Sequence, residues 1–292
     1  MPIRTIIIIS GICASLLMYW IIAWGPGISQ DSIVYLKTAQ SLLSGEGFYE
    51  SNKPLTHFPP IYPLLIAVAG FFQKGDLLQA TRLLSAFFTG ANIILLCLAI
   101  QICTNNDLSA VCSTLFFFLS SATFFSVHTM AWSEPAFIAF TLSTIILLSF
   151  HIISGKFYLL LVASFVASMA LTTRYIGVTL LPTIAVVVLI FGDGSLRNKI
   201  KKIYSAVTIA SLPLAIFLIR NMLVAESATN RSISVHPIGI GNLKLGNYYG
   251  YLFNFTYRPS SNYEGILILY YPYFIISFFV LFIYKKTSIK YK

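Results

Sequence analysis

Hydrophobic residues in this 292-residue chain gather in long runs that are separated by short polar stretches. Runs of about 20 apolar residues match the helix length that crosses roughly 30 Å of hydrocarbon. The pattern predicts an all-α polytopic membrane protein with about eight crossings, organised as a single transmembrane domain over residues 1–292. The predicted spans are Ile6–Trp24, Leu78–Ile102, Leu108–Phe125, Glu134–Ile153, Phe157–Thr172, Ile176–Phe191, Ile203–Ile219 and Ile266–Tyr284.

Two shorter segments are predicted to be helical without crossing the membrane. Ser29 suits a helix N-cap and Gly45 suits a helix stop, so we expect an amphipathic juxtamembrane helix between them. The apolar stretch Ile61–Phe72 is too short to cross alone, and we expect it to dip into the membrane interface. Both segments belong to the first long loop, residues 25–77.

The distribution of charge predicts the orientation. Only 10% of residues are charged, against about 25% in soluble domains, and the net charge is +10. The basic residues cluster beside apolar spans, at residues 197–202 and 285–292, which is typical of membrane topology signals and does not indicate nucleic-acid binding. With an even number of crossings, both termini are predicted to be cytoplasmic in the plasma (inner) membrane. The loops 25–77 and 221–265 then lie outside.

Candidate chemistry begins with Asp31, in the first turn of the predicted juxtamembrane helix, with Tyr35 one turn later on the same face. The helix macrodipole alone favours an anion there, but it also keeps the carboxylate ionised and able to accept a proton. Arg82 and Arg174 lie at the outer ends of apolar helices, where an unpaired charge in hydrocarbon costs about 2.5–3.5 kcal/mol. They snorkel to the interface or bind a phosphate, and Arg82 alternatively pairs with Asp76 or Glu134.

Other polar residues of the outer side have a structural and a functional interpretation. Glu134 follows Ser133 and precedes Pro135, which is good helix-start chemistry, and it is also placed to orient a basic side chain. His57 and Lys53 are either solvated interfacial residues or contacts for substrate. No Gly-x-x-x-x-Gly-Lys-Ser/Thr loop, CxxC or HExxH motif is present, which disfavours a cytosolic nucleotide-sugar enzyme.

Five stretches in order carry a family resemblance: DSIVYLKTAQSLLSGEGFY, HFPPIYPLLIA, ATRLLSAFFTGANIILL, SEPAFIAFTLSTIILL and TTRYIGVTLLP. Together they resemble the GT-C membrane glycosyltransferases, in the bacterial branch similar to protein O-mannosyltransferases and aminoarabinose transferases. The resemblance covers residues 1–190, whereas residues 191–292 match only in topology and include the loop 221–265. It implies an enzyme of the cell envelope that transfers a sugar from a polyprenyl-phosphate donor to an extracytoplasmic glycolipid, polysaccharide or protein.

The resemblance also implies roles for single residues. Asp31 maps onto the family's catalytic base, and we expect inversion at the anomeric carbon. Arg174, Arg82 and His57 are expected to bind the donor phosphate, with Glu134, Tyr35 and Lys53 as substrate-binding or supporting residues. No cofactor is required by these patterns, although a divalent cation (Mg²⁺ or Mn²⁺) held by Asp31 and Glu134 is an open alternative.

Two other functions fit the same sequence. A lipid or glycan transporter, such as a flippase, also carries charges near outer helix ends, although transporters generally show paired repeats that are not found here. A non-catalytic, truncated relative of the glycosyltransferases is the third interpretation.

Overall fold

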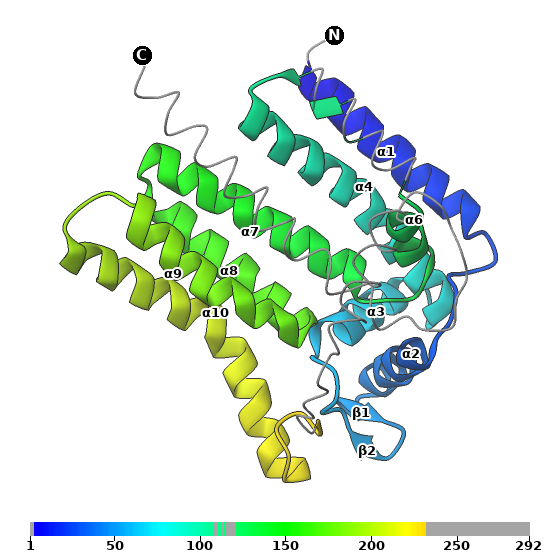
Figure 1. Ribbon diagram of the computed structural model, residues 1–292. Coiled ribbons are helices and arrows are strands. Elements are labelled where there is room, and N and C mark those ends of the chain that lie inside the picture. The colour runs from blue at the N-terminus through cyan, green and yellow to red at the C-terminus, as the bar shows by residue number, and fades with distance from the viewer. Residues whose placement is uncertain (1–2, 108–109, 112–113, 115–120, 232–292) are drawn as a thin grey trace, which may run out of the picture. The chain divides into compact units, whose positions relative to one another are not determined.

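The described part of the chain is predominantly helical (Figure 1). A computed structural model describes residues 3–107, 110–111, 114 and 121–231. Within the described part, residues 3–96 and 127–231 belong to one compact unit. Its apolar helices agree with the prediction of an all-α membrane protein.

Seven apolar helices are described, but only three are long enough to cross a membrane by length and composition. These three are α4 (Leu77–Thr104), α7 (Glu134–Ser154) and α10 (Leu196–Ala225). The shorter ones are α1 (Ile3–Ile21), α3 (Ile61–Phe72), α8 (Phe157–Thr173) and α9 (Leu180–Phe191). The eight predicted crossings are therefore not confirmed. The predicted span Ile266–Tyr284, and most of Leu108–Phe125, lie outside the described residues.

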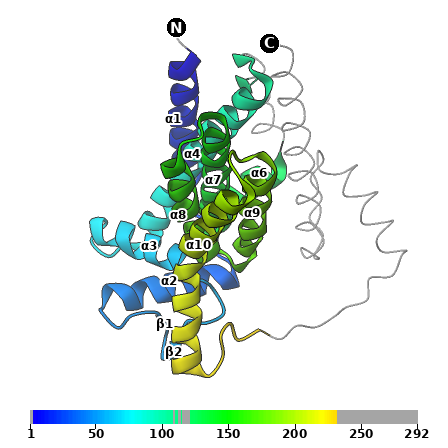
Figure 2. The same cartoon turned by 90° about the vertical axis from the view of Figure 1, so that its left-hand side faces the viewer.

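Helix α10 is longer than predicted. It was expected over Ile203–Ile219 but covers 30 residues, which corresponds to about 45 Å of helix and exceeds the roughly 30 Å of a hydrocarbon core. The Ser195 side chain caps its start by accepting from the Asn198 amide, so the lysine-rich run joins the helix. Pro213 lies inside α10. The last half of α10 reaches a small hairpin of β1 (Tyr49–Glu50) and β2 (Lys53–Pro54) (Figure 2).

Helices α7, α8, α9 and α10 pack around a shared apolar core. Small residues on α8, including Ala163, Ala167 and Ala170, are fully buried, which lets neighbouring backbones approach closely. After α8 the chain turns through a 3₁₀ helix, Tyr175–Thr179, into α9. Gly177 in this turn lies against the backbone of Ala170, where a side chain would collide. This tight turn fixes the position of Arg174 at the end of α8.

The first long loop folds as helix, hairpin and helix. Helix α2 (Gln30–Leu43) begins at the predicted cap Ser29 and packs on α3. A small antiparallel hairpin, β1 (Tyr49–Glu50) and β2 (Lys53–Pro54), separates the two helices and is an addition to the all-α prediction. Helix α3 has the bounds that the apolar stretch predicted.

Helices α1 and α4 approach closely at two glycines. A side chain at Gly90 would collide with the backbone of Gly11 and the Ser15 hydroxyl, whereas one at Gly11 would meet mainly the flexible side chain of Ile94. Such small-residue contacts allow close packing of helices in a membrane, where packing replaces the hydrophobic effect.

Candidate functional site

The starts of α2 and α7 are held side by side by backbone hydrogen bonds. The Gly27 amide donates to the Thr129 carbonyl over 2.8 Å, and the Ala131 amide donates to the Gly27 carbonyl over 2.9 Å. As a result, the first turn of α2, which carries Asp31, lies in the same region as the first turn of α7, which carries Glu134.

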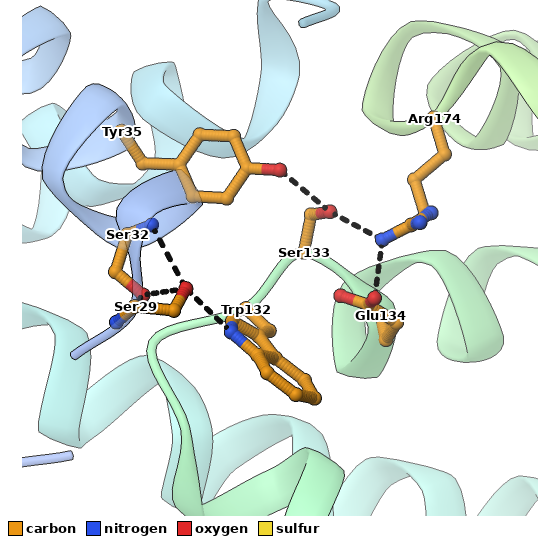
Figure 3. A network of polar contacts seen from close by, with 7 residues as sticks. All are labelled: Ser29, Ser32, Tyr35, Trp132, Ser133, Glu134 and Arg174. Carbon is orange, nitrogen blue, oxygen red and sulfur yellow. Dashed lines mark hydrogen bonds and ion pairs between the residues drawn. The ribbon is translucent and has the colours of Figure 1, made fainter. Parts of the chain in front are cut away.

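Ser29 fixes the start of α2. Its hydroxyl accepts from the Ser32 amide while the Ser32 hydroxyl accepts from the Ser29 amide, a reciprocal capping arrangement. The indole of Trp132 also donates to the Ser29 hydroxyl over 2.8 Å (Figure 3). This bond ties the cap of α2 to the residues that precede α7.

Ser133 occupies the cap position of α7, as the sequence predicts, but its hydroxyl does not cap the helix. It accepts a hydrogen bond from Nη1 of Arg174 over 3.1 Å and lies 3.3 Å from the hydroxyl of Tyr35, a long contact (Figure 3). Ser133 is fully buried. Its side chain therefore connects the start of α7 to Tyr35 on α2 and to Arg174 at the end of α8. The first amides of α7 have no side-chain cap.

Arg174 forms an ion pair with Glu134. The same Nη1 lies 2.5 Å from Oε1 of Glu134, and the two side chains are 27% and 19% exposed. A guanidinium carries five N–H donors, of which this arrangement uses two. The other three have no partner among the described residues, so Arg174 is anchored on one edge while its other edge can bind an anion.

Tyr35 is the buried end of the polar network that it forms with Ser133, Arg174 and Glu134. It is 3% exposed and packs edge-on against Phe58 and Tyr62, with ring centroids 4.9 and 5.0 Å away. Burial raises the pKa of its hydroxyl well above the usual range, while Ser133 and Arg174 oppose the rise and the carboxylates of Glu134 and Asp31 add to it. The hydroxyl therefore remains protonated at physiological pH.

Asp31 is the exposed member of this group. It takes part in no ion pair within the described part of the chain, and its side chain is open to solvent. Its carboxylate nevertheless acts electrostatically on the same Tyr35 hydroxyl that Arg174 and Glu134 influence. The exposed carboxylate of Asp31 thus acts on the same phenol as the guanidinium of Arg174, without a direct contact between the two among the described residues.

Three cationic or phenolic side chains hold the segment 48–58 through its backbone carbonyls. Arg220 donates to the carbonyls of Phe48 and Leu55, each over 3.0 Å. Tyr175 donates to the Thr56 carbonyl over 2.7 Å, and Arg231 donates to the His57 carbonyl over 3.0 Å. These bonds fix the segment beside the network.

The side chains of this segment and of Arg231 border the network. His57 is exposed, with its ring 4.8 Å from that of Phe58, and Lys53 is exposed on β2. The Arg231 guanidinium lies 5.5 Å from the Tyr175 ring and 5.8 Å from the Phe58 ring, which are cation–π distances. Arg231 therefore adds a second cation beside the residue that follows Arg174.

Arg82 contacts Tyr19 of α1 and is not part of the network around Arg174. Its Nε and Nη2 donate to the Tyr19 carbonyl over 3.1 and 2.8 Å, and its guanidinium stacks 3.6 Å from the Tyr19 ring. The partners considered for it in the sequence are engaged elsewhere: Asp76 accepts from the Gln79 amide, and Glu134 binds Arg174. Arg82 thus holds α4 against the end of α1.

The two carboxylates considered for a divalent cation, Asp31 and Glu134, have different surroundings. Among the described residues, no group of three His, Cys, Asp or Glu side chains is placed to hold a metal. Of the two carboxylates considered, Glu134 is already neutralised by Arg174. His128 is fully buried in the last turn of α6 (Ala122–Thr129), with a ring nitrogen 2.9 Å from the Asn92 amide nitrogen.

Ser133 and Arg220 are among the residues of the site that the sequence does not predict to belong to it. The sequence predicts Ser133 only as a cap, because nothing in its local sequence distinguishes a cap from a contact between helices. Arg220 had a usable signal, since a charge inside the apolar run FLIRNML is costly unless it finds partners.

Comparisons with family models, with curated proteins and with solved structures give no match to this chain.

Proposed function

We propose that this protein is a membrane glycosyltransferase that moves a sugar from a polyprenyl-phosphate donor to an acceptor hydroxyl outside the plasma membrane. The observation that supports it most is that an exposed Asp31, which forms no ion pair among the described residues, and an Arg174 that is anchored on one edge only both act on the buried Tyr35. Transfer from a phosphate donor needs a base for the acceptor and a cation for the leaving group.

In the proposed reaction the carboxylate of Asp31 takes the proton of the acceptor hydroxyl. The acceptor oxygen forms a bond to the anomeric carbon as the bond from that carbon to the phosphate oxygen breaks. The electron pair leaves with the polyprenyl phosphate, whose charge is stabilised by the three unused N–H donors of Arg174. A single displacement of this kind inverts the anomeric centre.

Neighbouring residues have supporting roles in this scheme. Glu134 and Ser133 hold the guanidinium in one orientation, which removes the cost of ordering it when the donor binds. Arg231 and His57 border the same region and are assigned to donor or acceptor contacts. Lys53, exposed on the hairpin, is assigned an outer contact with the headgroup. Arg82, which is committed to Tyr19, is left out of the phosphate site.

The test is reconstitution of the full chain in vesicles with candidate polyprenyl-phosphate sugars and acceptors. Mass spectrometry of glycolipid, polysaccharide and protein products should detect a new glycosidic bond. Nuclear magnetic resonance of that product should show inverted anomeric configuration. A retained configuration would contradict the single displacement. Movement of the labelled donor across the bilayer with no covalent product would favour a flippase.

A further inference from the structure

A second site lies at the opposite end of the helices from Arg174. Helix α8 starts at Phe157 and α9 ends at Phe191, so the turn into α10 lies away from the junction of α8 with α9 (Figure 1). An open cavity of about 430 Å³ is found there, lined by Phe157, the turn Asp193–Gly194 and the first turns of α10.

One face of α10 supplies the polar wall of this cavity. Asn198, Lys201, Lys202 and Ser205 are spaced at positions i, i+3, i+4 and i+7, so they share one side of the helix. The Lys202 ammonium donates to the Asp193 carbonyl over 3.4 Å, and the Lys201 ammonium has no hydrogen bond among the described residues. Two ammonium groups thus border one open space.

One acid also lines the cavity. The carboxylate of Asp193 lies beside Gly155, in the turn between α7 and α8. The lining therefore carries two positive charges and one negative charge, and Arg197 and Lys199 lie on the same turns of α10 outside the lining. The balance at this end of the helices favours an anion.

Exposed apolar side chains also lie at this end of α10, on the side of the helix away from the cavity face. Leu196, Ile200 and Tyr204 recur every four residues and are 62%, 55% and 74% exposed. Phe157, at the cavity wall, is also exposed. A soluble anion would leave Phe157 without an apolar partner, whereas a lipid offers acyl chains beside its phosphate.

We propose that this cavity binds the headgroup of an anionic phospholipid from the leaflet at this end of the helices. The phosphate is held by Lys201 and Lys202, Asn198 and Ser205 donate to the headgroup oxygens, and an acyl chain covers Phe157. Basic pockets between membrane helices recognise anionic headgroups in this way. The inference does not depend on the transferase proposal.

The experiment titrates the full chain, purified in a neutral detergent, with short-chain phosphatidylglycerol and with phosphatidylcholine of the same chain length. Bound lipid is counted by native mass spectrometry and the melting temperature is followed. We expect phosphatidylglycerol to bind at least tenfold more tightly than phosphatidylcholine. The double variant Lys201→Gln/Lys202→Gln should lose this preference, whereas Lys37→Gln/Lys74→Gln, with the same charge change at exposed positions elsewhere, should retain it.

A second variant separates the cavity from simple charge. Ser205→Trp keeps every charge and fills the cavity, so it should weaken phosphatidylglycerol binding at least fivefold. If the double variant does not fold, Ser205→Trp alone tests whether the cavity binds the lipid. Equal binding of the two lipids, or unchanged phosphatidylglycerol binding in either cavity variant, would overturn the proposal. Inorganic phosphate that raises the melting temperature as much as phosphatidylglycerol would also overturn it, in favour of a free-anion site.

Discussion

Arg174 donates to Ser133 over 3.1 Å across 41 positions of sequence, at the residue where α7 begins. The hydroxyl that sequence rules assign to the first amides of a helix is instead turned toward a guanidinium and a buried tyrosine. The start of α7 thus forms polar contacts with α2 and with the end of α8, in place of a side-chain cap.

Ser133→Ala should destabilise the protein through Tyr35. The variant leaves the Tyr35 hydroxyl, which is 3% exposed, without its hydrogen-bond partner, at a cost of about 1–3 kcal/mol. Adding Tyr35→Phe should restore most of that stability, because both partners are then removed. Thermal unfolding in detergent measures the free-energy changes.

The matched control is Ser29→Ala, which removes a genuine cap and should cost about 1 kcal/mol. Tyr35→Phe should give no rescue in that background. If Tyr35→Phe fails to rescue Ser133→Ala as well, the role of Ser133 as the hydrogen-bond partner of Tyr35 is wrong.

Arg174→Lys should impair transfer more than Glu134→Gln. A lysine has one ammonium and cannot hold Ser133 and Glu134 while presenting further donors to a phosphate, so we expect a loss of at least tenfold in kcat/KM for the donor. Glu134→Gln keeps a hydrogen-bond acceptor for Arg174 and should cost less than tenfold. Steady-state kinetics with varied donor concentration measures both; equal effects would argue against an anchored phosphate clamp.

The segments that sequence patterns located well are those bounded by local signals. The helices at Ile61–Phe72 and Phe157–Thr173 agree with prediction within one residue, because Pro, Gly or charged residues flank each apolar run. The extent of α10 could not be read from hydropathy, because lysine-rich turns are polar and yet favour helix. Hydropathy identifies only the apolar part of a helix, and α10 extends beyond its apolar part at both ends.

The site was less accessible to sequence reasoning than the helices. Asp31 and Tyr35 share one helix, so their proximity follows from helical spacing. The contacts of Arg174 depend on where α7 and α8 end in space, which no local pattern specifies. Arg82 and Arg174 look alike in sequence, and only their neighbours distinguish a packing residue from a member of the polar network.

Gly90→Ala should destabilise the contact between α1 and α4. The added methyl group would meet the Gly11 backbone, which cannot rotate away, so we expect a loss of about 1–3 kcal/mol. Gly11→Ala is the control and should cost less, since it meets mainly the side chain of Ile94. Thermal unfolding of the two variants compares them. A larger loss for Gly11→Ala would contradict the described packing.

Tyr175 should make the protein sensitive to alkali. Burial raises the pKa of this phenol from 10.0 to about 12, although the charge of Arg231 opposes the rise. The folded state then holds a proton that the unfolded state releases, so the contribution is complete below pH 10 and is lost as the pH rises to about 12. Tyrosinate absorbance and unfolding followed together should show this fall. Tyr175→Phe should reduce it, and an unchanged alkaline transition in that variant would exclude Tyr175 as its source.

If Asp31 accepts the proton of the acceptor, its role is measured by the single-turnover transfer rate of Asp31→Asn, with donor binding measured on the same sample. Because Asp31 is exposed and unpaired in the described part of the chain, the variant should fold and bind donor as the parent does. Its transfer rate should fall at least a hundredfold, while Glu50→Gln, a neutralised acid on the hairpin, should transfer at the parent rate. Transfer by Asp31→Asn at the parent rate would contradict the account.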